Sequence, residues 1–205
     1  LAIITGFCSR IIRMAANEEM SRPEIVATTE RILNTAHRID RIIQSLRLVS
    51  RDGERDAKQE VALGDILNEV ITLSETALVH SNISLRLDQF DKNQKVTVRF
   101  VQIVQVLLNL LNNSIAAIAQ LSDRWIEFRT ESDGQFVHIY VTDSGEGIAP
   151  DLCDKIMEPF FTTKELGKGS GLGLSISKGI IESHNGTFTL VRSATHTTFK
   201  ISLPR

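Results

Sequence analysis

The sequence predicts an α+β fold in two parts: a two-helix hairpin at residues 1–55, followed by an α/β sandwich at residues 56–205. Two observations lead to this prediction. Apolar residues in the first part recur at spacings of three, four and seven, as they do in packed helices. In the second part, helical segments and alternating, strand-like segments follow one another, which is typical of a mixed sheet covered by helices on one face.

Composition limits the classes of function. The formal net charge of −2 over 205 residues provides no basic field for nucleic acid. Cys8 and Cys153 lie far apart without a further ligand pair, so we expect neither a disulfide framework nor a zinc site, and both suit a reducing compartment. No apolar run approaches the roughly 20 residues of a membrane helix. We expect a cytoplasmic fragment of a longer protein whose membrane anchor, if it has one, lies upstream of Leu1.

The hairpin is predicted from two apolar stripes. The stripe of the first helix consists of Leu1, Ile4, Cys8, Ile11 and Ala15. Ser21 and Glu24 form a capping box that begins the second helix. The heptad positions of that helix are Ile25, Ile32, Ile39 and Leu46. Because two helices make only a thin core, we expect two copies to pair into a four-helix bundle.

The sandwich is predicted element by element from periodicity. A short apolar piece, Val61 to Leu63, comes first. Helices are expected at residues 64–81, 99–121 and 172–183. Strands are expected at residues 83–87, 125–130, 135–142, 187–191 and 197–203. A turn containing Asp133 and Gly134 joins the second and third of these strands.

Asn109 and Asn113 are four residues apart on the predicted helix at 99–121, so both amides project from one face. Carboxamide oxygens are neutral, hard ligands, which Mg²⁺ accepts together with phosphate oxygens and water. Taken alone, the pair is better explained as satisfied core amides or caps, and Asn112 between them favours a polar patch. A glycine cluster later in the chain reverses this preference, because a phosphate site needs a metal partner.

Asp143 follows the alternating strand FVHIYV and precedes Ser144-Gly145-Glu146-Gly147. A carboxylate held there by turn geometry can accept a hydrogen bond from an exocyclic amine, which would select adenine over guanine. The alternative interpretation is a strand-ending Asp in an Asx turn, a common use of that residue.

Glycines at positions 167, 169, 171 and 173 open directly into an apolar helical run. Their unshielded N–H groups, at the positive end of that helix, form a phosphate cradle. The preceding Pro159-Phe160-Phe161-Thr162-Thr163-Lys164 could anchor a mobile lid from which Lys164 reaches phosphate, or it could be an ordinary loop with a hydrophobic plug. The chain has no GxxxxGK[ST] pattern, and no GxGxxG opens a βαβ unit.

Together these motifs resemble the catalytic and ATP-binding domain of sensor histidine kinases. QVLLNLLNNSIAAI is similar to the family's N box, DSGEGI to its first glycine box, EPFFTTK to its F box and GKGSGLGLSI to its second glycine box. The resemblance implies that ATP binds with Mg²⁺, that Asn109 and Asn113 hold the metal, and that Asn109 is catalytic. It also implies nucleotide contacts from Asp143, Gly145, Gly147, Phe160, Lys164, Lys168, Gly169, Gly171, Leu172, Gly173 and Thr198.

The hairpin likewise resembles the family's dimerisation and phosphoacceptor domain, and RIDRIIQSLRLVSR is similar to its second helix. The resemblance implies a homodimer, and it implies transfer of the γ-phosphoryl of ATP through a histidine to an aspartate of a response-regulator receiver domain. The chain opens where the family's phosphoacceptor box ends, so we expect the phosphorylated histidine just upstream of Leu1. The histidines present are expected to be structural or solvated: His37, His80, His138, His184 and His196.

Two other functions fit part of the sequence. One is another enzyme of the same superfamily, such as a type II topoisomerase, a mismatch-repair ATPase or a serine kinase acting on an anti-sigma system. Those ATPases usually carry a glutamate where Asn109 stands, and because an amide cannot act as a base, hydrolysis is disfavoured. The other is a non-catalytic signalling scaffold that dimerises and presents the hairpin to a partner. A histidine immediately before Leu1 would favour the enzyme over the scaffold.

Overall fold

The computed structural model describes residues 57–164, 170–192 and 195–205, together with positions 6, 8, 9, 24, 26–32 and 35. The chain divides into two compact units, one of Leu1–Arg47 with Thr162–Ser170 and one of Leu48–Phe161 with Gly171–Arg205. In the first unit, residues 26–32 are helical, and the Thr28 hydroxyl donates to the carbonyl of Glu24 (2.7 Å). Most of the predicted hairpin, its pairing into a dimer and its boundary at residue 55 lie outside the described residues.

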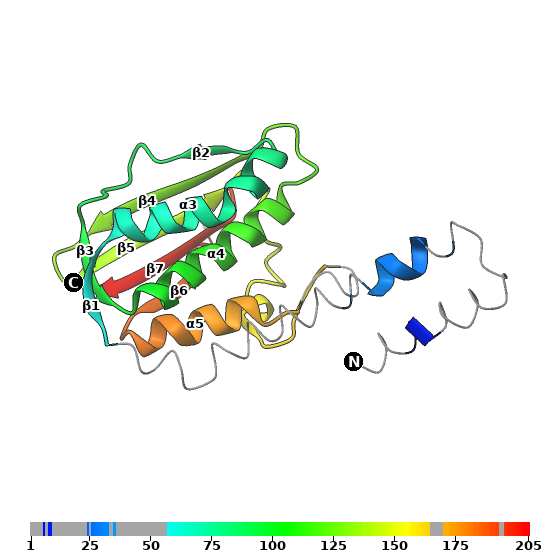
Figure 1. The fold of residues 1–205 in the computed structure, drawn as a ribbon. Coiled ribbons are helices and arrows are strands. Elements are labelled where there is room, and N and C mark those ends of the chain that lie inside the picture. Colours follow the sequence, from blue (N-terminus) through cyan, green and yellow to red (C-terminus); the bar gives the residue numbers. More distant parts are fainter. Residues whose placement is uncertain are drawn as a thin grey trace. The chain divides into compact units, whose positions relative to one another are not determined.

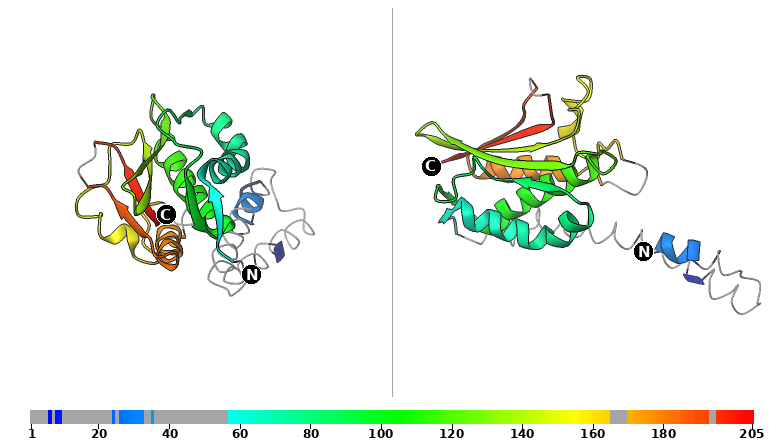
Figure 2. Two further views of the ribbon diagram at one scale, coloured as in Figure 1. Left: turned by 90° about the vertical axis from the view of Figure 1, so that its left-hand side faces the viewer. Right: turned by 90° about the horizontal axis from the view of Figure 1, so that it is seen from above.

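The second unit is an α/β sandwich in which helices cover one face of a five-stranded sheet (Figure 1, Figure 2). The strand order is β2 (Ser84–Arg86), β4 (Trp125–Ser132), β5 (Phe136–Asp143), β7 (Thr198–Pro204) and β6 (Thr187–Leu190). The β2–β4 pair is parallel and the other pairs are antiparallel, so the sheet is mixed. The covering helices are α3 (Leu63–His80), α4 (Phe100–Ala117) and α5 (Gly173–Ser183). This architecture confirms the predicted fold class.

A second sheet, of two strands, differs from the prediction. In it, β1 (Gln59–Ala62) pairs antiparallel with β3 (Lys95–Val98). The sequence predicts only a short apolar piece near β1, and no strand between residue 87 and the helix expected from residue 99. Strand β3 does alternate, and its two valines are each 1% exposed, but its short alternation runs almost directly into α4, so it was not separated from that helix. The short 3₁₀ helix η1 (Lys155–Met157) was likewise not predicted.

Helix α4 lies between α3 and α5 in the helical layer (Figure 1). Its residues Ile103, Leu107, Leu110 and Leu111 are at most 1% exposed. Contrary to the expectation from the sequence, α4 is long and apolar enough to cross a membrane, and among the described helices it alone meets that criterion. A helix in the core of a soluble protein can meet the same criterion, and 44% of this stretch is buried within the fold. Its place in the core therefore accounts for its apolar sequence.

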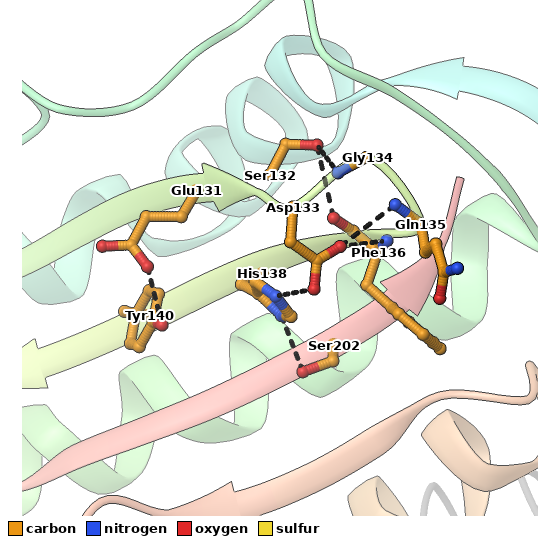
Figure 3. Close-up of polar contacts among 9 residues, drawn as sticks. All are labelled: Glu131, Ser132, Asp133, Gly134, Gln135, Phe136, His138, Tyr140 and Ser202. Atoms are coloured by element: carbon orange, nitrogen blue, oxygen red, sulfur yellow. Dashed lines mark hydrogen bonds and ion pairs between the residues drawn. The ribbon is translucent and has the colours of Figure 1, made fainter.

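The turn between β4 and β5 helps to set the register of the central strands (Figure 3). The Asp133 carboxylate accepts the N–H groups of Phe136 (2.8 Å) and Gln135 (3.0 Å), and these hydrogen bonds lower its pKa. The same carboxylate lies 3.2 Å from Nε2 of His138. A slip of one residue would turn every side chain to the opposite face of the sheet. By fixing the register, the turn keeps Asp143 at the far end of β5 on the helix-covered face.

Candidate functional site

Asn109 of α4 and Gly173, the first residue of α5, lie in direct contact. The amide nitrogen of Asn109 donates to the hydroxyl of Ser177, one turn further along α5 (3.0 Å). A Cβ atom added to Gly173 would come within 2.2 Å of the amide oxygen of Asn109, so this contact requires glycine. Asn113 is half-buried one turn later on the same face of α4. The structure therefore brings the amide face of α4 to the glycine-rich segment.

Phe160 and Gly171 bring together the two ends of the segment between them. The N–H of Phe160 donates to the carbonyl of Gly171 (2.9 Å). Gly171 has a φ of +67°, and an added Cβ would lie 2.3 Å from the carbonyl carbon of Phe160. Phe160 has a φ of +69°, and the residue is 74% exposed. Leu172 then caps α5, whose first turn carries N–H groups that have no partner within the helix.

The Asp143 carboxylate is buried at the end of β5, and the residue is only 3% exposed. It accepts hydrogen bonds from the N–H of Gly145 (3.0 Å) and from the hydroxyls of Ser114 and Thr197. Burial raises the pKa of the carboxyl, while these hydrogen bonds and the charge of His196 oppose the rise. The protein thus holds the carboxylate in one position, as recognition of an exocyclic amine requires.

Thr198, a predicted nucleotide contact, does not direct its hydroxyl towards Asp143. Its hydroxyl pairs with the hydroxyl of Thr142 (3.1 Å), on the face of the sheet opposite to the helices. Its neighbour Thr197 instead contacts Asp143 with its hydroxyl and accepts the Asp143 N–H at its carbonyl (3.0 Å). Successive residues of a strand point to opposite faces, which explains why a shift of one position moves the hydroxyl away from the site.

The remaining predicted residues are divided between the two units. Gly147 lies in the turn after Asp143 with a φ of +87°. Lys164 belongs to the first unit, where its backbone N–H donates to the hydroxyl of Thr162 (3.1 Å). Lys168 and Gly169 lie outside the described residues, so their phosphate contacts stay predictions, as does the contact expected of Lys164.

Four residues around the site were not among the predicted site residues: Ser114, Ser177, His196 and Thr197. Two of them left a signal in the sequence. Ser114 is a polar residue among the buried, apolar residues of α4. Thr197 is an even number of residues away from the apolar residues of β7 that face the helices, so its side chain lies on the same face of the sheet. His196 lies in a loop, where no periodicity indicates which way its side chain points.

The donor set at Asn109 and Asn113 fits Mg²⁺. Carboxamide oxygens are hard and neutral, and Mg²⁺ is usually held by few protein ligands together with water and substrate phosphates. Throughout the described part of the chain, no three His, Cys, Asp or Glu side chains cluster so as to hold a metal ion. At this site the two amides would supply the protein ligands of a metal, and the phosphates of a nucleotide would supply others.

A hollow of about 400 Å³ lies apart from these residues, and its walls contain Glu60, Asp91, Asn93, Gln94, Lys95, Val96, Thr97 and Arg205. Its carboxylates already have partners. Glu60 pairs with Lys95 (3.0 Å), and Asp91 accepts the N–H of Asn93 (2.9 Å). None of the residues predicted for the site lines this hollow, so it is not part of the candidate site.

The fold and the site define the class of protein. The family described as "Histidine kinase-, DNA gyrase B-, and HSP90-like ATPase" matches residues 98–205, which is more than half of the chain. This stretch contains α4, α5 and every residue predicted at the site. The chain belongs to this ATPase family.

Within the family, the chain is similar to sensor histidine kinases. It is 31% identical over 207 residues to the sensor protein FixL of Bradyrhizobium diazoefficiens, covering 100% of this chain and 40% of FixL. It is 35% identical over 170 residues to the sensor histidine kinase ZraS of Escherichia coli, covering 82% of this chain and 36% of ZraS. The chain therefore spans 40% or less of the length of these curated relatives.

Solved structures give the same class. The catalytic domain of histidine kinase ThkA is 32% identical with a TM-score of 0.65, covering 73% of this chain and 96% of that domain. ThkA in complex with the response regulator protein TrrA is 28% identical with a TM-score of 0.76, covering 98% of this chain and 57% of ThkA.

Proposed function

We propose that this chain is the ATP-binding and phosphotransfer part of a cytoplasmic sensor histidine kinase in a two-component system. It transfers the γ-phosphoryl of ATP to a histidine on the N-terminal hairpin, through which it dimerises. The histidine then passes the phosphoryl to an aspartate of a response-regulator receiver domain. The observation that carries the proposal is the contact between Asn109 and Gly173, in a chain whose relatives are sensor histidine kinases.

The nucleotide is expected to lie across the described contacts. Its adenine would donate from the exocyclic amine to Asp143, which is held by Gly145 and two hydroxyls. Its phosphates would lie at the amino end of α5, because the positive end of a helix favours anions. Mg²⁺, held by Asn109 and Asn113, would neutralise part of the phosphate charge.

The chemistry suits an amide site. Phosphoryl transfer depends on positioning and charge neutralisation, because its transition state is loose. A neutral imidazole, with a reference pKa of about 6.5, is nucleophilic at pH 7 and needs orientation more than a strong base. The nitrogen–phosphorus bond forms while the bond to the β–γ bridging oxygen breaks, and ADP leaves with that electron pair. Water need not be activated, so an amide at position 109 is sufficient.

The partners are proposed from the relatives. ThkA was solved in complex with the response regulator TrrA, which supports a receiver domain as the acceptor of the phosphoryl group. In the second step, a carboxylate oxygen of the receiver bonds to phosphorus while the nitrogen–phosphorus bond breaks. The heptad spacing of the hairpin supports a homodimer.

Calorimetric titration with Mg-ATP tests the site. Asn113→Ala should weaken binding by more than about tenfold, equivalent to 1.4 kcal/mol, because a metal ligand is lost. Asn112→Ala is the matched control, since Asn112 is exposed and adjacent on the same helix. Equal affinities of the two variants would contradict the assignment.

Transfer is tested separately, with γ-labelled ATP, the chain and a hairpin that carries the histidine. Acid-labile label on the hairpin is the expected result. Binding of ATP without any transfer would favour the scaffold.

A further inference from the structure

His196 contacts the turn that holds Asp143. Its Nδ1 lies 3.1 Å from the carbonyl oxygen of Gly145. A carbonyl can only accept, so Nδ1 carries a proton and donates it. The N–H of the same glycine donates to the Asp143 carboxylate (3.0 Å). Gly145 is therefore held at its N–H by Asp143 and at its carbonyl by His196.

The ring of His196 is itself held in place from the other side. It packs edge-to-face against Trp125, with ring centroids 5.0 Å apart and an interplanar angle of 80°. The guanidinium of Arg86 lies 4.1 Å from the centroid of the same indole. Trp125 is buried, with 8% of its surface exposed. Both aromatic contacts have favourable geometry. A continuous line of contacts thus runs from Arg86 through Trp125 and His196 to Gly145.

The backbone of Trp125 holds the same turn independently of His196. The Ser144 N–H donates to the carbonyl of Trp125 (3.0 Å), and the Ser144 hydroxyl accepts the Trp125 N–H (3.3 Å). These contacts anchor Ser144 to β4, but they do not fix the peptide group between Gly145 and Glu146. The orientation of that peptide group depends on the partners of Gly145. In that peptide, His196 is the side chain that fixes the carbonyl.

We propose that His196 is a positioning residue that sets the base selectivity of the nucleotide site. By holding the carbonyl of Gly145, it keeps the N–H of that residue on Asp143 and so fixes the carboxylate where an adenine amine can reach it. A site built around a fixed buried acceptor discriminates strongly against a ligand that cannot donate to it. The inference rests on the proposed function, since it assumes that Asp143 faces the base.

Two substitutions separate the hydrogen bond from the ring. His196→Phe keeps an aromatic ring beside Trp125 and removes the donor. His196→Asn removes the ring and keeps an N–H donor at the same distance along the side chain as Nδ1. The readouts are the dissociation constants for Mg-ATP and Mg-GTP and the melting temperature of the chain.

If His196 positions the turn, His196→Phe lowers the ratio of ATP to GTP affinity by about fivefold to tenfold, the effect of losing one hydrogen bond. His196→Asn keeps the ratio within about twofold of the wild-type value. A purely structural histidine would instead lower the melting temperature and leave the ratio unchanged in both variants, which would overturn the inference. If His196→Phe does not fold, His196→Leu, which also removes the donor, takes its place: a lowered ratio supports the inference, and an unchanged ratio overturns it.

The wild-type chain distinguishes failure of the inference from failure of the proposed function. If wild type prefers ATP and both variants keep that preference, the role of His196 is wrong while the nucleotide site stands. If wild type binds neither nucleotide, or binds both equally, the assignment of Asp143 to the base fails, and the role of His196 fails with it.

Discussion

The two ends of the candidate site are built in different ways. At the Asp143 end, side-chain hydroxyls and a backbone N–H from three segments converge on one buried carboxylate. At the Asn109 end, the close contacts are made to bare glycine backbone, at Gly173 and Gly171. Function at the first end therefore depends on hydrogen-bond donors and acceptors. Function at the second end depends on the absence of side chains at Gly173 and Gly171. A single added Cβ atom would overlap a neighbouring residue there.

Gly173→Ala gives the largest expected effect. The new methyl group would overlap the amide of Asn109, which must rotate away and give up its hydrogen bond to Ser177. Because a side chain and not the backbone moves, the melting temperature should fall by only a few degrees. Mg-ATP binding should become undetectable by calorimetry, since the displaced amide is the proposed metal ligand.

Gly179→Ala is the matched control in the same helix. An added Cβ there meets nothing within 4 Å, so binding should be unchanged. The chain should gain up to about 1 kcal/mol, because alanine favours helix over glycine. Wild-type affinity in the Gly173→Ala variant would show that the two ends do not differ in the way described.

At the Asp143 end of the site, Asp143→Asn should weaken Mg-ATP binding without lowering the stability of the chain. Removing the charged acceptor should weaken Mg-ATP binding by about tenfold to a hundredfold, as for a hydrogen bond to a charged group. Burial raises the pKa of Asp143 in the folded chain, so the native state holds this proton more tightly than the unfolded state does. Stability is then lost as pH rises from about 4 through the folded pKa, and the charged group is a cost at pH 7.

The asparagine variant removes that cost. Its free energy of unfolding in urea at pH 7 should therefore equal or exceed the wild-type value. A marked loss of stability would mean that the hydrogen bonds to the carboxylate outweigh its desolvation. In that case, the Asp143 end would behave like the Gly173 end, where a substitution is expected to lower both Mg-ATP affinity and the stability of the chain.

The same contrast explains how much the sequence could predict. Long periodic segments such as α4 and β5 were predicted because their burial repeats over many residues, whereas the short β3 runs almost directly into α4 and was not. The convergence of Asn109 with the glycine segment was expected from the motifs, since the proposed phosphate cradle and the proposed metal ligands would have to meet.

The threonine hydroxyl that contacts Asp143 belongs to Thr197, which was not among the predicted site residues. Thr197 and Thr198 are equivalent as residue types, and only the side of the strand on which each lies distinguishes them. Phe199 and Ile201 are buried against the helices, so the alternation already placed Thr197 on the side of Asp143. The contact of His196 with Gly145 could not be predicted, because it depends on how one loop folds against another.

The smallest expected effect is that of pH on a histidine between α4 and α5. This histidine links the carboxyl end of α5 to the amino end of α4, away from Asn109 and Gly173. His184 is 2% exposed at the carboxyl end of α5. Its Nε2 accepts the N–H of Arg99, the residue that caps α4 (3.0 Å), and its Nδ1 donates to the carbonyl of Ile180 (2.8 Å). A neutral ring satisfies both contacts, whereas a protonated ring cannot accept from Arg99.

Burial lowers the pKa of His184, and the charges of Lys58 and Arg99 lower it further against the opposing hydrogen bond to Ile180. Between the folded pKa and the unfolded value of about 6.5, the unfolded chain binds more protons than the native chain. The contribution of His184 to stability is thus complete above pH 6.5 and is lost as pH falls towards the folded pKa. The slope cannot exceed about 1.4 kcal/mol per pH unit for one group.

Urea denaturation of wild type and His184→Gln at pH 7.5, 6.5 and 5.5 measures this contribution. Glutamine can still accept from Arg99 and does not titrate, so the difference between the two chains isolates His184 from the other histidines. Wild type should lose stability relative to the variant below pH 6.5, and parallel pH profiles would contradict the assignment. If the difference appears, acidification loosens the α4–α5 packing from the end remote from Asn109. Mg-ATP affinity should then weaken with it in wild type and not in the variant, since the contact at Gly173 depends on how closely the two helices pack.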